Sequence, residues 1–246
     1  MTLKGYASPT LLATYEIERI PVIAEMLKIT TELFNRVISS TVQQELDLQK
    51  AMQDASAQQL ESEERSPWKR SRKFFQLYLN YRWSPAVIDE RFADAEGVHD
   101  AYGVAEQDVR AGDRAPDAPE LKVVHPSGSG QTTRLFDIFK PMLHTVLLFG
   151  SEDVQTFRSS LDVIRVLPKE LFKVVLVLAP GGEAKGELGA IDLVVEDIKD
   201  YARDNFGLKD MVVPVVVLAR PDGMVGAIAT SEYGVDKYVS AVFARA

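Results

Sequence analysis

Histidines and clustered carboxylates are the residues of this chain that could carry acid–base or metal chemistry. His99, His125 and His144 are far apart in the sequence, and none belongs to an HExxH or HxH arrangement. Protein zinc sites often draw on ligands at such short spacings. We therefore expect no metal site, and we place His144 at the edge of the apolar strand that it opens.

The acidic residues include two clusters, residues 61–64 in a polar segment and residues 196–200 in a stretch that we expect to be helical. Carboxylates that work as an acid and a base need burial, because burial separates their pKa values. Charged residues of this kind usually lie on solvated faces instead. We therefore assign no general acid or base.

Ser151 follows an expected strand and precedes an expected helix, which is where some hydrolases place a nucleophile. GxSxG is missing, so we interpret Ser151 as a helix N-cap, with Glu152 and Asp153 complementing the helix dipole. Two glycine-rich stretches, residues 127–131 and 181–189, lack the Walker A order of glycine and lysine. We expect a hairpin connection at the first and an exposed loop at the second.

The chain has no cysteine, which excludes disulfides, thiolate zinc sites, iron–sulfur clusters and cysteine nucleophiles. Its formal net charge of −8 disfavours nucleic acid as a partner, because phosphate contacts require a concentrated basic surface. Residues 69–73 (KRSRK) are a local basic exception. We expect them to form a solvated loop, with a patch for an acidic partner or nucleic acid as the alternative. No catalytic, cofactor-binding or metal-ligating residue is assigned.

Nothing in the sequence indicates a membrane protein. The longest apolar runs, such as residues 211–219, are too short to cross a bilayer. The first residues lack the charged and then apolar pattern of a secretory signal, so cytoplasmic residence is the default expectation.

In the first fifty positions, apolar residues recur at the spacing of an amphipathic helix. Ser8 and Pro9 suit its start, as a capping hydroxyl and a proline at the first helical position. We expect Pro21 to break or kink this run into two helices, the second ending near Gln59. A polar segment, residues 55–73, then marks the first boundary.

The middle of the chain carries one strand pattern and a long connection. Apolar and polar residues alternate over residues 75–83, which predicts a half-buried strand that ends at Ser84 and Pro85. Residues 90–119 are rich in Ala, Asp, Gly and Pro, so we expect a crossing segment without lasting regular structure.

The last part of the chain alternates strand and helix patterns. We predict strands over residues 134–139, 144–149, 173–178, 211–220 and 225–229, and helices over residues 152–161, 191–206 and 236–245. Asp222 and Gly223 form the turn of the clearest hairpin. A helix separates the strands at 144–149 and 173–178, so these should be parallel. The predicted fold class is α/β, with long N-terminal helices followed by a mixed central sheet.

Several short segments resemble, in the same order, those that follow the flavin-binding part of phenol-hydroxylase-like FAD monooxygenases. They are residues 3–9 (LKGYASP), 11–22 (LLATYEIERIPV), 80–85 (NYRWSP), 110–117 (RAGDRAPD), 134–137 (RLFD) and 220–226 (RPDGMVG). Asp89 and Glu90 also fit the family pattern. Ile20 departs from it, because the family usually has an arginine there. The shared order extends over nearly the whole chain.

The resemblance implies that the chain ends in a thioredoxin-like domain, which in this family mainly serves subunit contact. Redox members of that fold carry CxxC where this chain has residues 149–154. Intact hydroxylases of the family use FAD and NAD(P)H, but this sequence lacks their GxGxxG turn. The implied units are a helical tail of the FAD and substrate region (residues 1–65), a strand and linker (66–118) and a cysteine-free thioredoxin-like dimerisation domain (119–246).

Two hypotheses remain open. In the first, the chain is a truncated or split aromatic hydroxylase that serves dimerisation and support, binds no cofactor by itself and is not active alone. It then forms a homodimer through the thioredoxin-like domain, or accepts a FAD-domain chain on the segment that begins at Ser8 and ends at Val42. In the second, it is a stand-alone thioredoxin-like interaction module without redox activity, since fold alone does not decide function.

Overall fold

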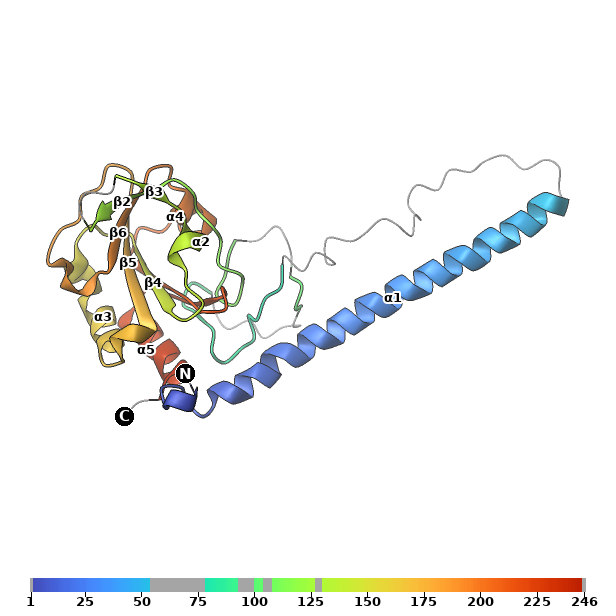
Figure 1. Ribbon diagram of the computed structural model, residues 1–246, viewed down its shortest axis with the longest axis horizontal. Coiled ribbons are helices and arrows are strands. Elements are labelled where there is room, and N and C mark those ends of the chain that lie inside the picture. Colours follow the sequence, from blue (N-terminus) through green and yellow to red (C-terminus); the bar gives the residue numbers. More distant parts are fainter. Residues whose placement is uncertain (1, 54–77, 93–99, 104–107, 127–129, 245–246) are drawn as a thin grey trace.

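The computed structural model describes residues 2–53, 78–92, 100–103, 108–126 and 130–244. Figure 1 shows a twisted sheet with helices on both faces and one long helix, α1 (Leu11–Gln53), that extends away from it. Among the described helices, none combines the length and apolar content that crossing a membrane requires.

The sheet has eight strands in the order β1-β8-β7-β4-β5-β6-β2-β3. The strands are β1 Ile88–Asp89, β2 Leu121–His125, β3 Thr132–Thr133, β4 His144–Phe149, β5 Phe172–Leu178, β6 Leu193–Asp197, β7 Val215–Ala219 and β8 Val225–Ala229. The remaining helices are α2 Leu135–Ile138, α3 Arg158–Arg165, α4 Tyr201–Asn205 and α5 Glu232–Val242, with 3₁₀ turns η1 Thr2–Lys4, η4 Val154–Phe157, η5 Lys169–Leu171 and η6 Leu188–Ala190.

The central strand β4 is buried along its whole length and separates two apolar clusters. Val146 and Leu148 belong to the cluster under α3 and α5, whereas Leu147 and Phe149 belong to the cluster under α2 and α4. Successive side chains of a strand point to opposite faces, which produces this division. Because helices cover both faces of the sheet at β4, every side chain of this strand is buried, and its residues are therefore mostly apolar.

The predicted sheet topology is confirmed at its centre. β4 and β5 are parallel, and β7 and β8 form the antiparallel hairpin around Asp222 and Gly223. β7 pairs antiparallel with β4, so β8-β7-β4-β5 has the order and polarity of a thioredoxin-like sheet. The predicted fold class is therefore confirmed: a mixed α/β fold with a long N-terminal helix and a cysteine-free thioredoxin-like domain.

The helix α1 is a single element, so the prediction that Pro21 would divide it into two helices is wrong. Proline at position 21 removes the amide that would donate to the Ile17 carbonyl. The indole N–H of Trp83 donates to that carbonyl at 2.9 Å, so the freed acceptor keeps a partner. The predicted helix end near Gln59 lies outside the described residues.

Residues 78–83 form turns and irregular backbone, so the strand predicted over residues 75–83 is wrong there; residues 75–77 lie outside the described range. The Asn80 amide donates to the Ala101 carbonyl, and the Tyr81 amide donates to the Gly112 carbonyl. Both acceptors lie in irregular segments, so these amides join loops and not a sheet.

The strand predicted over residues 134–139 is also wrong, because α2 occupies residues 135–138. Leu135 and Ile138 are both buried, and a spacing of three places them on one side of a helical turn. Asp117 organises the turn: its carboxylate accepts the Phe136 amide at 3.0 Å and pairs with Arg134. A distant side chain thereby satisfies an amide at the start of the helix.

The helix predicted over residues 191–206 is two elements, β6 and α4. Val194 and Val195 are fully buried on β6, which pairs in parallel with β5. A short apolar run that is buried on both faces has the same sequence pattern as a buried helix segment. Asp197 is likewise buried at the end of β6, so the expectation of a solvated helical face is wrong there.

Two other helices begin at residues that differ from the predictions. Asp153 caps the turn η4, and the Ser151 hydroxyl accepts the Asp153 amide at 3.1 Å instead of capping the helix. α5 begins four residues earlier than predicted, because the Ser231 hydroxyl accepts the Gly234 amide at 3.2 Å. A side-chain cap therefore marks the start of η4 and of α5.

Candidate functional site

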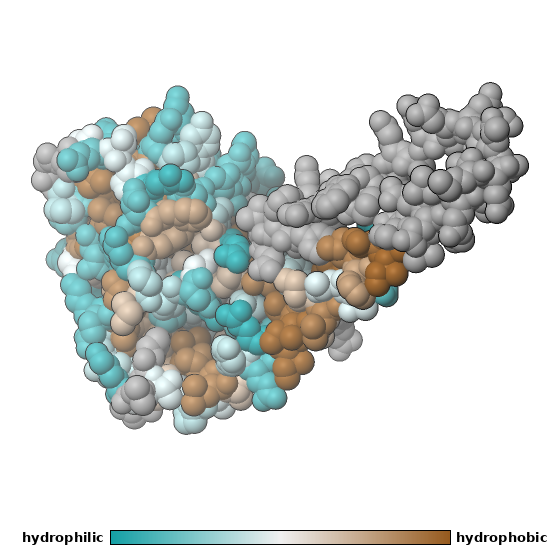
Figure 2. Space-filling view, turned by 45° about the vertical axis from the view of Figure 1, so that its right-hand side comes forward, coloured by the Kyte–Doolittle hydropathy of each residue, from teal (hydrophilic) through white to brown (hydrophobic). Residues whose placement is uncertain are grey.

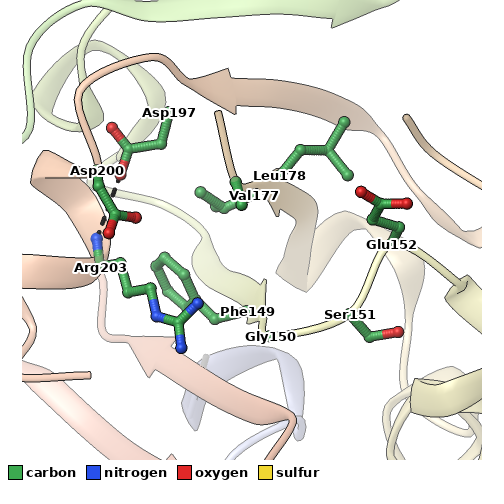
Figure 3. A pocket seen from close by; sticks show the side chains of 10 residues that line it. Phe149, Gly150, Ser151, Glu152, Val177, Leu178, Asp197, Asp200 and Arg203 are labelled. Carbon is green, nitrogen blue, oxygen red and sulfur yellow. Dashed lines mark hydrogen bonds between the residues drawn. The ribbon is translucent and has the colours of Figure 1, made fainter. Parts of the chain in front are cut away.

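A cavity of about 170 Å³ lies at the carboxyl ends of β4, β5 and β6. Ligands of open α/β sheets bind outside the carboxyl ends of the strands. The cavity has two polar sides with apolar side chains between them. Figure 3 shows Asp197, Asp200 and Arg203 on one side, Ser151 and Glu152 on the other, and Phe149, Val177 and Leu178 between.

The loop that enters this cavity from β4 is closely packed at Gly150, whose φ is +86°. A Cβ at this position would lie 2.9 Å from the Val213 carbonyl oxygen, so both the conformation and the space require glycine. Residues 149–154 thus run past the cavity where a redox member of the fold would carry its cysteines. Thiol exchange is excluded because the chain has none.

Asp197 is the most buried carboxylate of the cavity, with 1% of its surface exposed. Its oxygens accept the amides of Tyr201, Ala202 and Arg203 at 3.0, 2.7 and 3.3 Å. Burial raises the pKa of Asp197, and the three amides oppose that rise because they favour the charged form. The carboxylate therefore holds the first turn of α4 in place.

Two other charged groups of the cavity, Arg203 and Glu152, also have structural partners. The Arg203 guanidinium donates to the Leu208 carbonyl at 3.2 Å and to the Met211 carbonyl at 2.5 Å. Glu152 pairs with Lys185 at 2.8 Å, and the hydrogen bond from that ammonium lowers the pKa of Glu152. Within the described ranges, no group of three or more histidines and carboxylates is arranged to hold a metal ion.

A second polar site joins α1 to the thioredoxin-like domain. Glu18 on α1 is buried, and its carboxylate accepts two hydrogen bonds from Arg220 at 2.7 and 3.1 Å. The Ser84 hydroxyl donates to the same carboxylate at 2.7 Å. The bond from Trp83 to Ile17 lies one residue away along the helix. We call these five residues the α1 junction.

The α1 junction brings together three of the segments on which the family resemblance rests. Glu18 belongs to residues 11–22, Ser84 to residues 80–85 and Arg220 to residues 220–226. The segments are thus joined in space although 202 positions separate Glu18 from Arg220.

Two further segments are connected by ion pairs. Arg82 donates two hydrogen bonds of 2.7 Å to Asp113, which ties residues 80–85 to residues 110–117. Arg134 pairs with Asp117, which ties in residues 134–137. Contacts among these segments therefore form one continuous network.

Comparisons with known proteins give structural matches only: the sequence matches no family model and no curated protein. The flavin-dependent monooxygenase PieE, solved with FAD and substrate, is similar to this chain with a TM-score of 0.60 and 16% sequence identity. The match covers 98% of this chain and 40% of that chain. This chain shares its fold with part of a flavin-dependent monooxygenase. The shared part includes α1 as well as the sheet, because almost the whole chain is matched.

Two further matches concern about half of this chain each. Prx1a of Plasmodium yoelii has 10% identity and a TM-score of 0.40, over 52% of this chain and 86% of that chain. The thioredoxin domain of a thiol-disulfide oxidoreductase from Bacteroides vulgatus has 14% identity and a TM-score of 0.36, over 54% of this chain and 96% of that chain.

His144 is buried in the domain, with 3% of its surface exposed. It opens the central strand β4, and its ring lies 5.1 Å from that of Phe243 and 5.6 Å from that of Phe172. Burial lowers the pKa of His144 to about 3, and Arg220 adds to this effect. The sequence could not reveal this, because the surrounding rings come from β5 and from the segment after α5.

Several predicted features cannot be placed. The basic residues 69–73, the acidic residues 61–64 and His99 lie outside the described residues. Sequence reasoning missed Glu18 and Arg220 as partners, although both stand in quoted segments. The sequence shows that both residues are charged, but it does not show that folding buries them against each other.

Proposed function

We propose that this chain is the C-terminal, supporting part of a phenol-hydroxylase-like FAD-dependent aromatic hydroxylase. In this role it holds subunits or domains together and does not hydroxylate by itself. FAD and NAD(P)H belong to the intact enzyme. The observation that carries the proposal is the α1 junction, in which segments typical of the family contact one another through buried polar groups.

The extent of the structural likeness supports the same proposal. The match to PieE covers 98% of this chain, so α1 and the thioredoxin-like domain belong to one matched unit. A redox module of the thioredoxin type would need only the domain, together with its cysteines. This chain has the helix and lacks the cysteines.

Two cavities formed by the described residues are small compared with FAD. The cavity at the strand ends and a second one beside α3 have volumes of about 170 and 280 Å³. Both are smaller than the roughly 300 Å³ at which small-molecule sites begin, and FAD is a large dinucleotide. Asp197 and Asp200 at the first cavity would also repel a pyrophosphate. We therefore assign no flavin contact and no catalytic step to this chain.

The partners follow from the proposed role. The thioredoxin-like domain would form a homodimer, or a flavin-bearing chain would dock on the α1 segment between Ser8 and Val42. No nucleic acid is expected, given the net charge of −8.

Two measurements test the proposal. The purified chain, titrated with FAD and followed by visible absorbance, should show no saturable change. An antibody raised against the chain should detect, in its source cells, a longer polypeptide or a complex that contains flavin. A saturable flavin spectrum would contradict the absence of a cofactor site, and a free chain of 246 residues without flavin would contradict the enzyme role.

The second candidate is a stand-alone interaction module with no redox activity. One observation favours it: α1 carries large apolar side chains that are exposed in the chain as it stands. A free chain without flavin in the same experiment would support this candidate.

A further inference from the structure

The cavity beside α3, which we call the α3 cavity, has a volume of about 280 Å³ and an apolar floor. Side chains of α3 and β5 form this floor, each with only 3–7% of its surface exposed: Leu161, Ile164, Phe172 and Val174. A cavity of roughly 150 Å³ lined by such residues binds benzene. The α3 cavity is larger than that, but it is just below the roughly 300 Å³ typical of drug-sized ligands. It therefore suits a ligand of one or two rings.

The floor of the α3 cavity is held in place by its neighbours. The Phe172 ring lies 5.0 Å from that of Phe243 and 5.6 Å from that of His144. Asp192 fixes the backbone beside it, because its amide donates to the Val174 carbonyl at 2.9 Å and its carboxylate accepts the Val174 amide at 2.8 Å. The cavity is thus formed before a ligand arrives, which lowers the cost of binding.

The rim of the α3 cavity carries two cations and one carboxylate, namely Arg165, Lys169 and Asp192. The Lys169 ammonium lies 3.5 Å from the Asp192 carboxylate, and the lysine side chain is 83% exposed. Arg165 pairs at 3.0 Å with Asp162, which is not among the residues that line the cavity. Exposed pairs of this kind contribute little to stability, so both cations can turn to a ligand at small cost.

Positive charge also gathers around the rim. Burial lowers the pKa of Lys173 on β5, and the nearby Lys140 ammonium adds to this effect, whereas Asp192 opposes it. Glu170 does not line the cavity and accepts the Tyr6 hydroxyl at 3.4 Å. Asp192 thus faces more than one cation, so a second carboxylate would be attracted to this end of β5.

We propose that the α3 cavity binds a small aromatic carboxylate, with its ring on the apolar floor and its carboxylate between Arg165 and Lys169. Phe172 offers the ligand ring an aromatic neighbour. A ligand with one apolar end and one anionic end complements both the floor and the rim. The site does not depend on the proposed hydroxylase role. Figure 2 shows apolar residues along the described part of α1, which that role assigns to a flavin-bearing chain, whereas no α1 residue lines the α3 cavity.

An NMR titration of the full ¹⁵N-labelled chain with 1-naphthoate tests the site. We expect saturable shifts in the amides of Ala190 and Asp192, with a dissociation constant of about 1 mM or below. The cation 1-naphthylmethylammonium, which has the same rings, should bind about tenfold more weakly or worse, because the rim cations repel it. Shifts that do not saturate with 1-naphthoate would overturn the site. Equal affinity for the two probes would overturn the preference for a carboxylate.

Two variants show where the ligand binds. Ala190→Phe introduces a ring at the cavity lining and should abolish the binding of 1-naphthoate. Lys169→Gln should weaken that binding by about three- to fivefold and leave the binding of the neutral 1-naphthalenemethanol unchanged.

Lys209→Gln is the matched control for the rim cation. Lys209 also forms an exposed pair at 3.5 Å, with Asp204, and neither residue lines the cavity. This variant should bind 1-naphthoate like wild type. Undiminished binding to Ala190→Phe, or equal losses in Lys169→Gln and Lys209→Gln, would show that the ligand binds elsewhere and would overturn the proposal. Circular dichroism of each variant confirms that the chain is folded.

Discussion

Arg220 holds the buried carboxylate of Glu18 through two hydrogen bonds of 2.7 and 3.1 Å, and this pair links α1 to the thioredoxin-like domain. Arg220 also donates to Asp222 at 2.7 Å, so the guanidinium connects the helix to the β7–β8 turn. Burial alone would lower the pKa of Arg220, but these carboxylates more than offset that effect and raise it. The guanidinium therefore stays charged.

Removal of Arg220 should strongly destabilise the chain. Arg220→Met leaves Glu18 buried without its cation, and we expect a loss of about 3 kcal/mol in the free energy of unfolding. Urea unfolding followed by circular dichroism measures the change. Lys28→Met is the control, since Lys28 forms an exposed pair with Glu25 and should change stability by less than about 0.5 kcal/mol. Equal losses in the two variants would contradict the structural role of Arg220.

Stability should rise with pH between about pH 3 and 6.5 because of His144. In the unfolded chain this histidine binds a proton below about pH 6.5, whereas in the folded chain the pKa is about 3. The unfolded state therefore binds more protons in this interval, and His144 contributes a slope of about 1.4 kcal/mol per pH unit. Its contribution is fully present above pH 6.5 and is lost as the pH falls.

His144→Leu isolates this contribution. Unfolding free energies of wild type and variant are measured from pH 5 to 7.5, and the wild type should gain stability relative to the variant as the pH rises to about 6.5. The comparison removes the contribution of carboxylates, which both chains share. Parallel curves for wild type and His144→Leu would rule out the buried neutral histidine.

Gly234→Ala should destabilise α5 although alanine favours helices. An added Cβ would lie 2.4 Å from the carboxyl carbon of Glu90, whose oxygens accept the Ser231 amide at 2.9 Å and the Thr230 amide at 2.7 Å. Displacement of this carboxylate should cost about 2 kcal/mol. Gly189→Ala, where a Cβ meets nothing within 4 Å, is the control. A thermal midpoint for Gly234→Ala at or above that of Gly189→Ala would contradict this close packing.

The bond from Trp83 to the Ile17 carbonyl should depend on Pro21. Trp83→Phe removes the indole donor and should cost about 1 kcal/mol, because the carbonyl that Pro21 leaves free then loses its partner. In a Pro21→Ala background the helix amide supplies that partner, so the same change should cost less. A double-mutant cycle of unfolding free energies measures the difference. A coupling energy of zero would show that the two residues act independently.

The sequence predicted elements well where one local pattern decides the conformation. The buried strand β4 and the Asp222–Gly223 hairpin were found from apolar runs and turn residues alone. Prediction failed where a distant group decides. The Asp117 carboxylate accepts the Phe136 amide and so stabilises the helical turn at residues 135–138. The Trp83 indole donates to the Ile17 carbonyl, which Pro21 leaves without a helical donor in α1. Residues 193–197 form a strand because β5 and β2 pair with them on either side.

The composition alone excluded thiol chemistry, and the order of short segments alone suggested the hydroxylase family. Those conclusions need no coordinates, because they depend only on which residues are present and in what order. The tertiary structure decided which residues meet. Glu18 and Arg220 are 202 positions apart, and their charges become a structural link only where folding buries both. Burial and partners arise from the whole chain, so no local pattern could supply them.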